Sequence, residues 1–286
     1  MLKMLAVMGL VAIGLVRAQS QPTSQSTGAV AFEAASVKPR APGDNRFMFP
    51  RFFPGGRFVS NAPLGVVIAI AYNLPINPSP RLTGVPDWAG SMDAAYDIQA
   101  TGIFPAGLSE KARVERGRLM LQALLADRFK LAIHRETKEI PVYALVVAKG
   151  GPKLQRADVE ERDCPDPSAT PPPAPGTLCH GASGGRGSGI HARALAMSEL
   201  ARVMEDWADR PLVDKTGIKG LYHIETTGWQ PMQVAPFAPG AKQDGVDIAD
   251  LPTIFTVFEK LGLKMESEKD KVDVYVVDHV EKPTEN

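Results

Sequence analysis

The strongest constraint on the fold of this chain is an internal similarity between its two halves. Residues 131–143 and 263–275 follow one pattern: alternating apolar residues, a charged stretch, and a second alternating segment that ends in tyrosine. Residues 96–102 and 222–228 share a second pattern, Tyr-x-Ile-x-x-Thr-Gly, which alternates as β-strands do. In a chain of 286 residues, a repeat this long predicts a tandem or intertwined duplication rather than a solenoid.

Helical patterns come before the last alternating segment of each half. In the first half, Ser109 is placed to cap a helix that runs toward Ala126 and whose apolar residues recur at helical spacing. In the second half, Pro252 suits a first helical turn and Gly262 suits the stop of that helix. The same order of elements is therefore expected in both halves.

One further helix is predicted earlier in each half, at residues 64–72 in the first half and at residues 197–207 in the second. Each half then reads strand, helix, strand, strand, helix and β-hairpin, with the charged stretches 134–139 and 266–271 between the strands of the hairpins. This order predicts an α+β fold of two related lobes joined by a Pro/Gly-rich linker, and it leaves open whether the lobes are separate or intertwined. The expected segments are a signal peptide at 1–18, a flexible leader at 19–29, a first lobe at 30–157, the linker at 158–189 and a second lobe at 190–286.

The first eighteen residues have the features of a secretory signal. Lys3 supplies a positive start, residues 4–16 form an apolar run, and Val16 and Ala18 are small residues where a signal peptidase cleaves. A membrane span needs about 20 apolar residues, so this run is too short for an anchor. We expect cleavage, export to the periplasm or the extracellular space, and no membrane span in the mature chain.

Charge and composition exclude some classes of protein. The 32 basic residues are balanced by 32 acidic ones, whereas nucleic-acid binders carry a basic excess that neutralises phosphates. A hydrophobic fraction of 44% is typical of a folded globule and not of a disordered chain. We therefore expect no nucleic-acid partner.

Cys164 and Cys179 bracket the proline-rich part of the linker, and export would place them where disulfides form. A bond between them would close a loop of about 16 residues and would stabilise the fold by about 3 kcal/mol. The alternatives are a redox pair or, together with His180, half of a metal site. Redox pairs are usually spaced Cys-x-x-Cys, so a structural disulfide is the favoured interpretation.

No catalytic constellation, metal site or cofactor site is predicted. Residues 181–185 match Gly-x-Ser-x-Gly, but a serine nucleophile of that kind needs a strand before it and a helix after it. Residues 214–217, Asp-Lys-Thr-Gly, lack the companion motifs of phosphorylated ATPases and of penicillin-recognising enzymes, and they suit a turn. The five histidines show no ligand spacing.

An aromatic and basic stretch before the glycine pair 55–56 is the candidate binding segment. Aromatic residues and arginine dominate interaction hot spots, so this stretch could act as a partner-binding flap; the alternative is that its rings simply cover a sheet. The candidate binding residues are Phe47, Phe49, Arg51, Phe52, Phe53 and Arg57. A groove between the two lobes is the second expected binding surface.

Several segments together resemble a known family. They are 32–39 (FEAASVKP), 55–58 (GGRF), 84–88 (GVPDW), 120–131 (MLQALLADRFKL), 134–138 (HRETK), 142–153 (VYALVVAKGGPK), 211–217 (PLVDKTG) and 278–286 (DHVEKPTEN). Over essentially the whole mature chain, the sequence resembles a family of uncharacterised exported proteins that is expanded in soil Acidobacteria. Some relatives are fused to BlaR/MecR-type metallopeptidase sensors. The resemblance implies export and an extracytoplasmic sensing role, and it assigns no catalytic residue.

These patterns favour a non-enzymatic, exported binding or sensing module whose partner is a protein, a peptide or a glycan. The alternative is a secreted hydrolase of envelope or polymeric substrates, with an active site assembled from residues such as His134, Glu136 and Asp97. A third hypothesis is a structural protein of the cell surface.

Overall fold

The structure is a computed structural model, and it describes residues 30–41, 44, 48–53, 55–76, 79–105, 107–165, 174, 177–230, 232, 242–243 and 245–283. The expected signal peptide and leader, residues 1–29, lie outside the described residues, and so does Phe47. Within the described part of the chain, no helix is both long enough and apolar enough to cross a bilayer.

The first half of the chain contains ten elements: β1 (Ala34–Pro39), β2 (Arg51–Phe52), β3 (Arg57–Ser60), α1 (Leu64–Ala71), β4 (Leu82–Thr83), α2 (Asp87–Gly90), η1 (Met92–Ala94), β5 (Tyr96–Thr101), α3 (Glu110–Arg128) and β6 (Ala132–Val147). The second half contains β7 (Gln155–Arg156), η2 (Glu161–Asp163), β8 (Ser183–Gly185), β9 (Gly189–Leu195), α4 (Met197–Glu205), β10 (Leu212–Asp214), β11 (Tyr222–Glu225), β12 (Lys242–Gln243), β13 (Val246–Asp247), η3 (Ile248–Asp250), α5 (Ile254–Lys260) and β14 (Leu263–His279). The four predicted helices are all present, and the predicted cap of α3 is confirmed because the Ser109 side chain accepts a hydrogen bond from Ala112 N.

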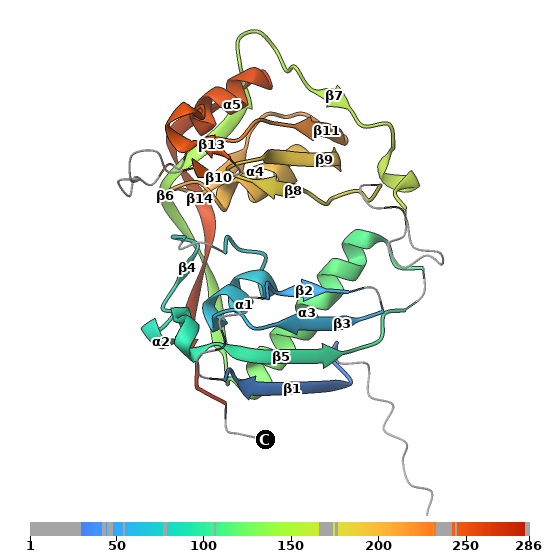
Figure 1. The fold of residues 1–286 in the computed structure, drawn as a ribbon, viewed down its shortest axis with the longest axis vertical. Coiled ribbons are helices and arrows are strands. Elements are labelled where there is room, and N and C mark those ends of the chain that lie inside the picture. Colours follow the sequence, from blue (N-terminus) through green and yellow to red (C-terminus); the bar gives the residue numbers. More distant parts are fainter. Residues whose placement is uncertain are drawn as a thin grey trace, which may run out of the picture.

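Three four-stranded sheets organise the described residues. Their strand orders are β1-β5-β3-β2, β10-β6-β14-β4 and β7-β11-β9-β8, and β12 pairs with β13 in a small ribbon. Figure 1 shows the first sheet with α1 and α3 at one end of the molecule, and the third sheet with α4 and α5 at the other end. The long strands β6 and β14 connect the two ends. The predicted α+β class is confirmed.

The prediction of two hairpins is wrong. β6 and β14 are each one continuous strand, and they pair with each other in antiparallel fashion from Ala132 opposite His279 to Val147 opposite Leu263. The charged stretches lie in the middle of this ribbon, where most of the β6 side chains are exposed, so that charge is not penalised by burial. Charges also pair across the strands, because Arg135 Nη1 lies 3.2 Å from Asp273 Oδ2.

The two halves repeat one pattern of backbone pairing around this ribbon. The short strand β10 lies parallel to β6, and β4 lies parallel to β14. Tyr143 N donates to Pro211 O over 2.8 Å, and Tyr275 N donates to Arg81 O over the same distance. Each long strand therefore has, along part of its length, a short parallel neighbour from the opposite half of the chain.

Two glycines occupy similar tight turns in the two halves of the chain. Gly56 lies just before β3 and has a φ of 84°, and Gly189 is the first residue of β9 and has a φ of 90°. Both values lie in the region that favours glycine. A Cβ atom at Gly56 would lie 1.9 Å from Gly102 O, and one at Gly189 would lie 1.9 Å from Thr226 O. In both halves the turn brings the chain against the segment that follows the Tyr-x-Ile strand.

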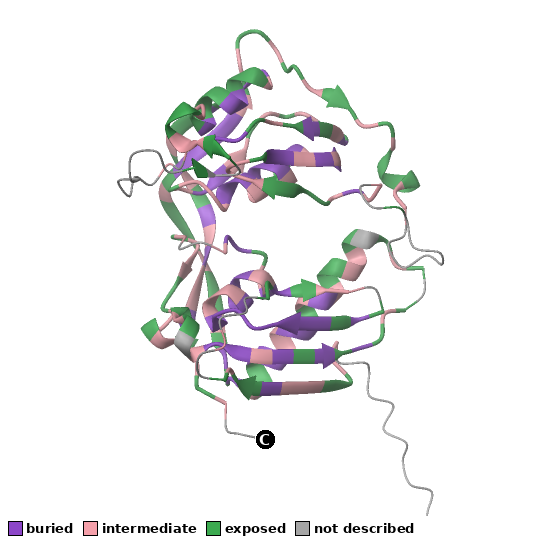
Figure 2. Cartoon of the chain, in the orientation of Figure 1, coloured by how far each residue is buried: buried purple, intermediate pink, exposed green. Residues whose placement is uncertain are grey.

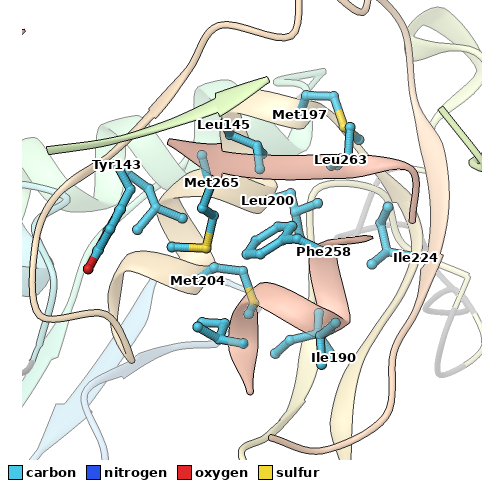
Figure 3. Packing of buried hydrophobic residues seen from close by; sticks show 14 of the residues in the cluster. Tyr143, Leu145, Ile190, Met197, Leu200, Met204, Ile224, Phe258, Leu263 and Met265 are labelled. Carbon is cyan, nitrogen blue, oxygen red and sulfur yellow. The ribbon is translucent and has the colours of Figure 1, made fainter. Parts of the chain in front are cut away.

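The buried side chains form two large clusters, and each uses residues from both halves of the chain. The first surrounds Phe58, α1 and α3 and includes Val277 from the end of β14. The second surrounds α4, α5 and Trp229 and includes Tyr143 and Leu145 from the end of β6. Figure 2 shows buried residues concentrated at the two ends of the molecule. In the second cluster, Phe258 lies among side chains of α4, β9, β11 and β14 (Figure 3).

Candidate binding groove between the two clusters

A groove of about 570 Å³ opens where the end of α1, α4, β10 and the middle of β14 meet. We call it the central groove. Its walls combine charged side chains, two tyrosine rings and aliphatic groups. The lining includes Tyr72, Arg81, Ser198, Arg202, Glu205 and Tyr275. Ligand sites are typically concave surfaces of this size with mixed apolar and polar walls.

A buried ion pair lies on one wall of the central groove. Arg81 Nε lies 2.5 Å from Glu205 Oε1, and the Glu205 side chain is only 3% exposed. Burial raises the pKa of Glu205, and the nearby Arg81 guanidinium offsets part of that rise. The pair joins the segment before β4 to the end of α4, so it holds the two sides of the groove together.

Arg202 makes a second connection between these two sides. Its Nε donates to Asn73 O over 2.9 Å, its Nη2 donates to Leu74 O, and its Nη1 lies 3.3 Å from Asp206 Oδ1. Asp206 Oδ1 in turn accepts a hydrogen bond of 2.9 Å from Ile76 N. These contacts fix the turn after α1 against α4 and position the floor of the groove.

An aromatic pair also lines the central groove. The ring centroids of Tyr72 and Tyr275 lie 5.3 Å apart, and burial raises the pKa of the Tyr72 hydroxyl, with a smaller contribution from Tyr275. Tyrosine rings offer an apolar face together with a hydroxyl that can form hydrogen bonds. The groove therefore suits a ligand that has both apolar and polar surfaces.

A second cavity, which we call the side pocket, lies beside the central groove between α3 and α4. It has a volume of about 460 Å³ and shares Asn73, Ser198 and Arg202 with the central groove. Its other charged side chains are Lys111, Glu115 and Arg118 from α3, and His180 and Glu199 from the second half of the chain.

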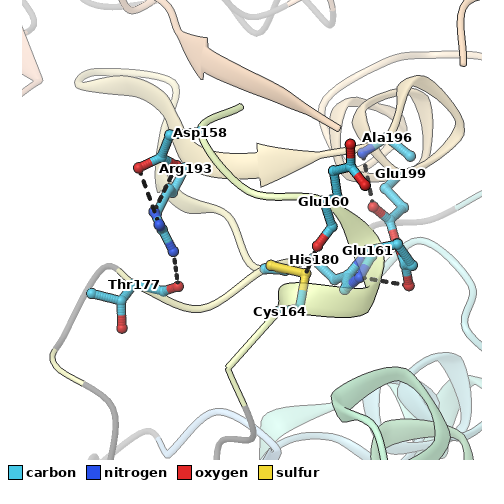
Figure 4. Close-up of a disulfide and its surroundings, with 10 residues drawn as sticks. Asp158, Glu160, Glu161, Cys164, Thr177, His180, Arg193, Ala196 and Glu199 are labelled. Carbon is cyan, nitrogen blue, oxygen red and sulfur yellow. Dashed lines mark hydrogen bonds and ion pairs between the residues drawn. A yellow bond between two sulfur atoms is a disulfide. The ribbon is translucent and has the colours of Figure 1, made fainter. Parts of the chain in front are cut away.

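The predicted disulfide is present between Cys164 and Cys179 (Figure 4), and the residue after Cys179 lines this pocket. The next residue, His180, has a φ of 59°, a left-handed conformation that is uncommon outside glycine. Its Nδ1 lies 2.8 Å from Glu199 Oε1 and its Nε2 lies 3.2 Å from Glu161 Oε1. His180 therefore links η2 to the start of α4, and the disulfide ties the residue before His180 to Cys164, which follows η2.

Glu199 also caps α4. Its Oε2 accepts a hydrogen bond of 2.9 Å from Ala196 N, while its Oε1 contacts His180. On the other side of the linker, Arg193 binds Thr177 O and the Asp158 carboxylate (Figure 4). Both ends of the cysteine loop are thus anchored to β9 and α4, the elements that lie behind the side pocket.

The candidate aromatic segment divides into rings with different surroundings. Phe52 packs against Phe58 with ring centroids 4.9 Å apart, and a Cβ atom at Gly117 of α3 would lie 2.9 Å from the Phe52 ring. Phe52 therefore covers the sheet, as the alternative interpretation expected. Phe53 lies between two guanidinium groups, those of Arg51 at 4.8 Å and Arg57 at 4.2 Å from its ring centroid.

The Phe53 ring borders a small pocket of about 220 Å³ that Asn61 and Asp97 also line. Phe49 is exposed. A binding role for this segment stays a prediction.

The residues named for a hydrolase lie in different surroundings. His134 Nδ1 lies 2.8 Å from Asp278 Oδ2, Glu136 pairs with Lys138 at 2.5 Å, and Asp97 borders the small pocket beside Phe53. Within the described residues, no group of three His, Cys, Asp or Glu side chains is arranged to hold a metal ion.

Sequence reasoning expected a groove between the lobes but missed the residues that line it. Arg81 lies more than 120 residues before Arg202 and Glu205 in the chain, and each of the three is ordinary in its local context. One available signal was Glu205 itself, a charged residue directly after Met204 in the apolar stripe of α4.

The fold and the groove define an α+β protein with a polar cavity between two hydrophobic clusters. The chain belongs to the DUF3738 family, described as proteins of unknown function, whose model matches residues 66–280. This range includes all the residues of the central groove and of the side pocket. No curated protein and no solved structure matches the chain.

Proposed function

We propose that this protein is an exported binding or sensing module that holds a peptide or a glycan in the central groove. The observation that carries the proposal is the groove itself, which is lined by both the tyrosine pair and the Arg81–Glu205 ion pair. Sugars and peptides both present apolar faces next to hydrogen-bonding groups, which matches such walls.

Export is supported by two independent features. The first eighteen residues carry the pattern of a cleavable signal, and the chain contains a disulfide, a bond that persists in oxidising compartments. The sensing role is supported by the resemblance to exported proteins, some of which are fused to metallopeptidase sensors.

Fractionation of cells that express the full chain tests export. We expect the protein in the periplasm or the medium, with Gln19 as its first residue by intact mass and with both cysteines oxidised. A chain that lacks residues 1–18 is the matched control and should stay in the cytoplasm. Full-length protein found uncleaved in the cytoplasm would contradict the export part of the proposal.

Binding is tested separately, by isothermal titration against soluble peptidoglycan fragments, chito-oligosaccharides and a mixed set of short peptides. Ser198 is exposed and borders the central groove, so Ser198→Trp should fill the groove and weaken binding at least tenfold. Ser188→Trp, at an exposed serine in the turn before β9, is the matched control and should bind as the wild type does. Equal binding by the wild type and Ser198→Trp would exclude the groove as the site.

A further inference from the structure

The side pocket brings together three basic side chains, of which Lys111 and Arg118 have few charged partners among the described residues. On α3, Lys111, Glu115 and Arg118 follow one another at intervals of four and three residues, so they share one face of the helix. Arg202 of α4 faces them across the cavity. The three basic side chains come from two helices, and hydrogen bonds from Arg202 to Asn73 O and Leu74 O hold α4 against the loop after α1.

Arg118 is the less satisfied of the two arginines in the side pocket. Within the described residues its one ion pair is with Glu115 at 3.8 Å, an intrahelical contact with a carboxylate that is 64% exposed, whereas Arg118 itself is 26% exposed. Such a pair contributes little, because solvent screens it. Burial and the neighbouring Arg202 charge both lower the pKa of Arg118, which means that the cation is held where its charge is not fully compensated.

The acidic groups nearby do not fill this role. Both oxygens of Glu199 are engaged, one by His180 and one by Ala196 N. His180 turns its two ring nitrogens toward carboxylates. Arg202 uses its guanidinium for Asn73, Leu74 and Asp206, so it is fixed in position while its charge still acts on the cavity.

We propose that the side pocket is a binding site for the oxyanion group of a small ligand, a carboxylate or a phosphate, with Arg118 as its principal contact. The planar guanidinium of arginine matches either oxyanion with two parallel hydrogen bonds. The exposed Lys111 adds a second charge to the lining, and Arg202 adds a third that its hydrogen bonds hold in place. A cavity of about 460 Å³ accommodates a small molecule and not a folded partner. The proposal does not rest on the identity of the ligand in the central groove, with which the side pocket shares Asn73, Ser198 and Arg202.

Titration calorimetry of the full mature protein in a low-salt, zwitterionic buffer tests the proposal. The probes are inorganic phosphate and citrate, and glycerol is the neutral probe. We expect saturable binding of phosphate, citrate or both, and none of glycerol; the tighter of the two anions identifies the oxyanion that the pocket prefers. Absence of saturable binding for both anions would overturn the proposal.

The matched variants are Arg118→Gln and Arg116→Gln, which remove the same charge from the same helix. Arg118→Gln should weaken anion binding at least tenfold, whereas Arg116→Gln, outside the pocket with its Nε bound to Ile103 O, should change binding less than twofold. An unchanged thermal midpoint in each variant verifies folding. Equal losses in both variants, or none in Arg118→Gln, would indicate unspecific attraction of anions and refute the site.

Discussion

Reduction of the Cys164–Cys179 disulfide should destabilise the protein without removing any atom from its packing. The bond closes the linker over a sequence separation of 15 residues. Cys179 is fully buried and packs with Ala194 and Leu221 in a small cluster of its own. Breaking the bond therefore frees a loop whose second end is set into the protein, while the first end, near Cys164, lies at the surface.

The size of the effect follows from the length of the loop. In the chain-entropy model, a closed loop of about 15 residues contributes roughly 3 kcal/mol to the free energy of unfolding, because it restricts the unfolded chain. With a urea dependence of about 3 kcal/mol per molar, this corresponds to a fall of about 1 M in the midpoint of urea unfolding. The amides at the start of α4 should also exchange faster, because Glu199 and His180 lose the support of the bond.

The assay is urea unfolding followed by tryptophan fluorescence, with and without a phosphine reductant, and with mass spectrometry to verify the state of the thiols. The variant Cys164→Ala/Cys179→Ala is the control and should not respond to the reductant. A decrease of less than about 0.5 kcal/mol in the reduced wild type would refute the reasoning. It would mean that the linker detaches before the rest of the protein unfolds.

Three further predictions concern the groove, a turn and the aromatic segment. Burial raises the pKa of the Glu205 carboxyl in the folded state above its ordinary value of 4.5. The contribution of Glu205 therefore favours folding at low pH and is lost as the pH rises from that value through the folded pKa. Urea unfolding across this range should show this fall in the free energy of unfolding in the wild type and not in Glu205→Gln. Gly189→Ala should destabilise by roughly 3 kcal/mol, because it combines a positive φ with a Cβ atom 1.9 Å from a carbonyl oxygen, and an unchanged thermal midpoint would contradict this. Phe52→Ala should cost about 1–3 kcal/mol in urea unfolding, and Phe53→Ala less than about 1 kcal/mol, since only the first ring is packed between the sheet and α3; the reverse order would count against this assignment.

Local patterns predicted the parts of the fold that are determined locally. The cap at Ser109, the stop at Gly262 and the disulfide follow from residue types over a few positions, and the structure has all three. The β6–β14 ribbon could not be recognised in this way, because its two strands are far apart in the chain and its charged centre has the composition of a loop. An exposed two-stranded ribbon and a hairpin loop have the same polarity, so composition does not distinguish them.

The candidate site was the harder part to predict, for the same reason. The ion pair of the central groove forms only after folding, because Arg81 reaches Glu205 from the other half of the chain. The side pocket depends on the approach of α3 to α4, and neither helix carries a recognisable motif for anions. The similarity between the two halves of the sequence led us to expect a groove between them, but it did not indicate which side chains would line that groove.

The pairing of β6 with β14 sets the order in which this protein can fold. The first hydrophobic cluster includes Val277, which lies close to the end of the chain, and β6 finds most of its partners in β14. A nascent chain that has been synthesised only as far as β6 therefore still lacks β14, which pairs with β6 and supplies Val277 to the first cluster. Folding of both units must wait for the last strand, and pairings of such high contact order form slowly. A chain truncated before β14 should accordingly fail to form either cluster, rather than leave one folded half behind.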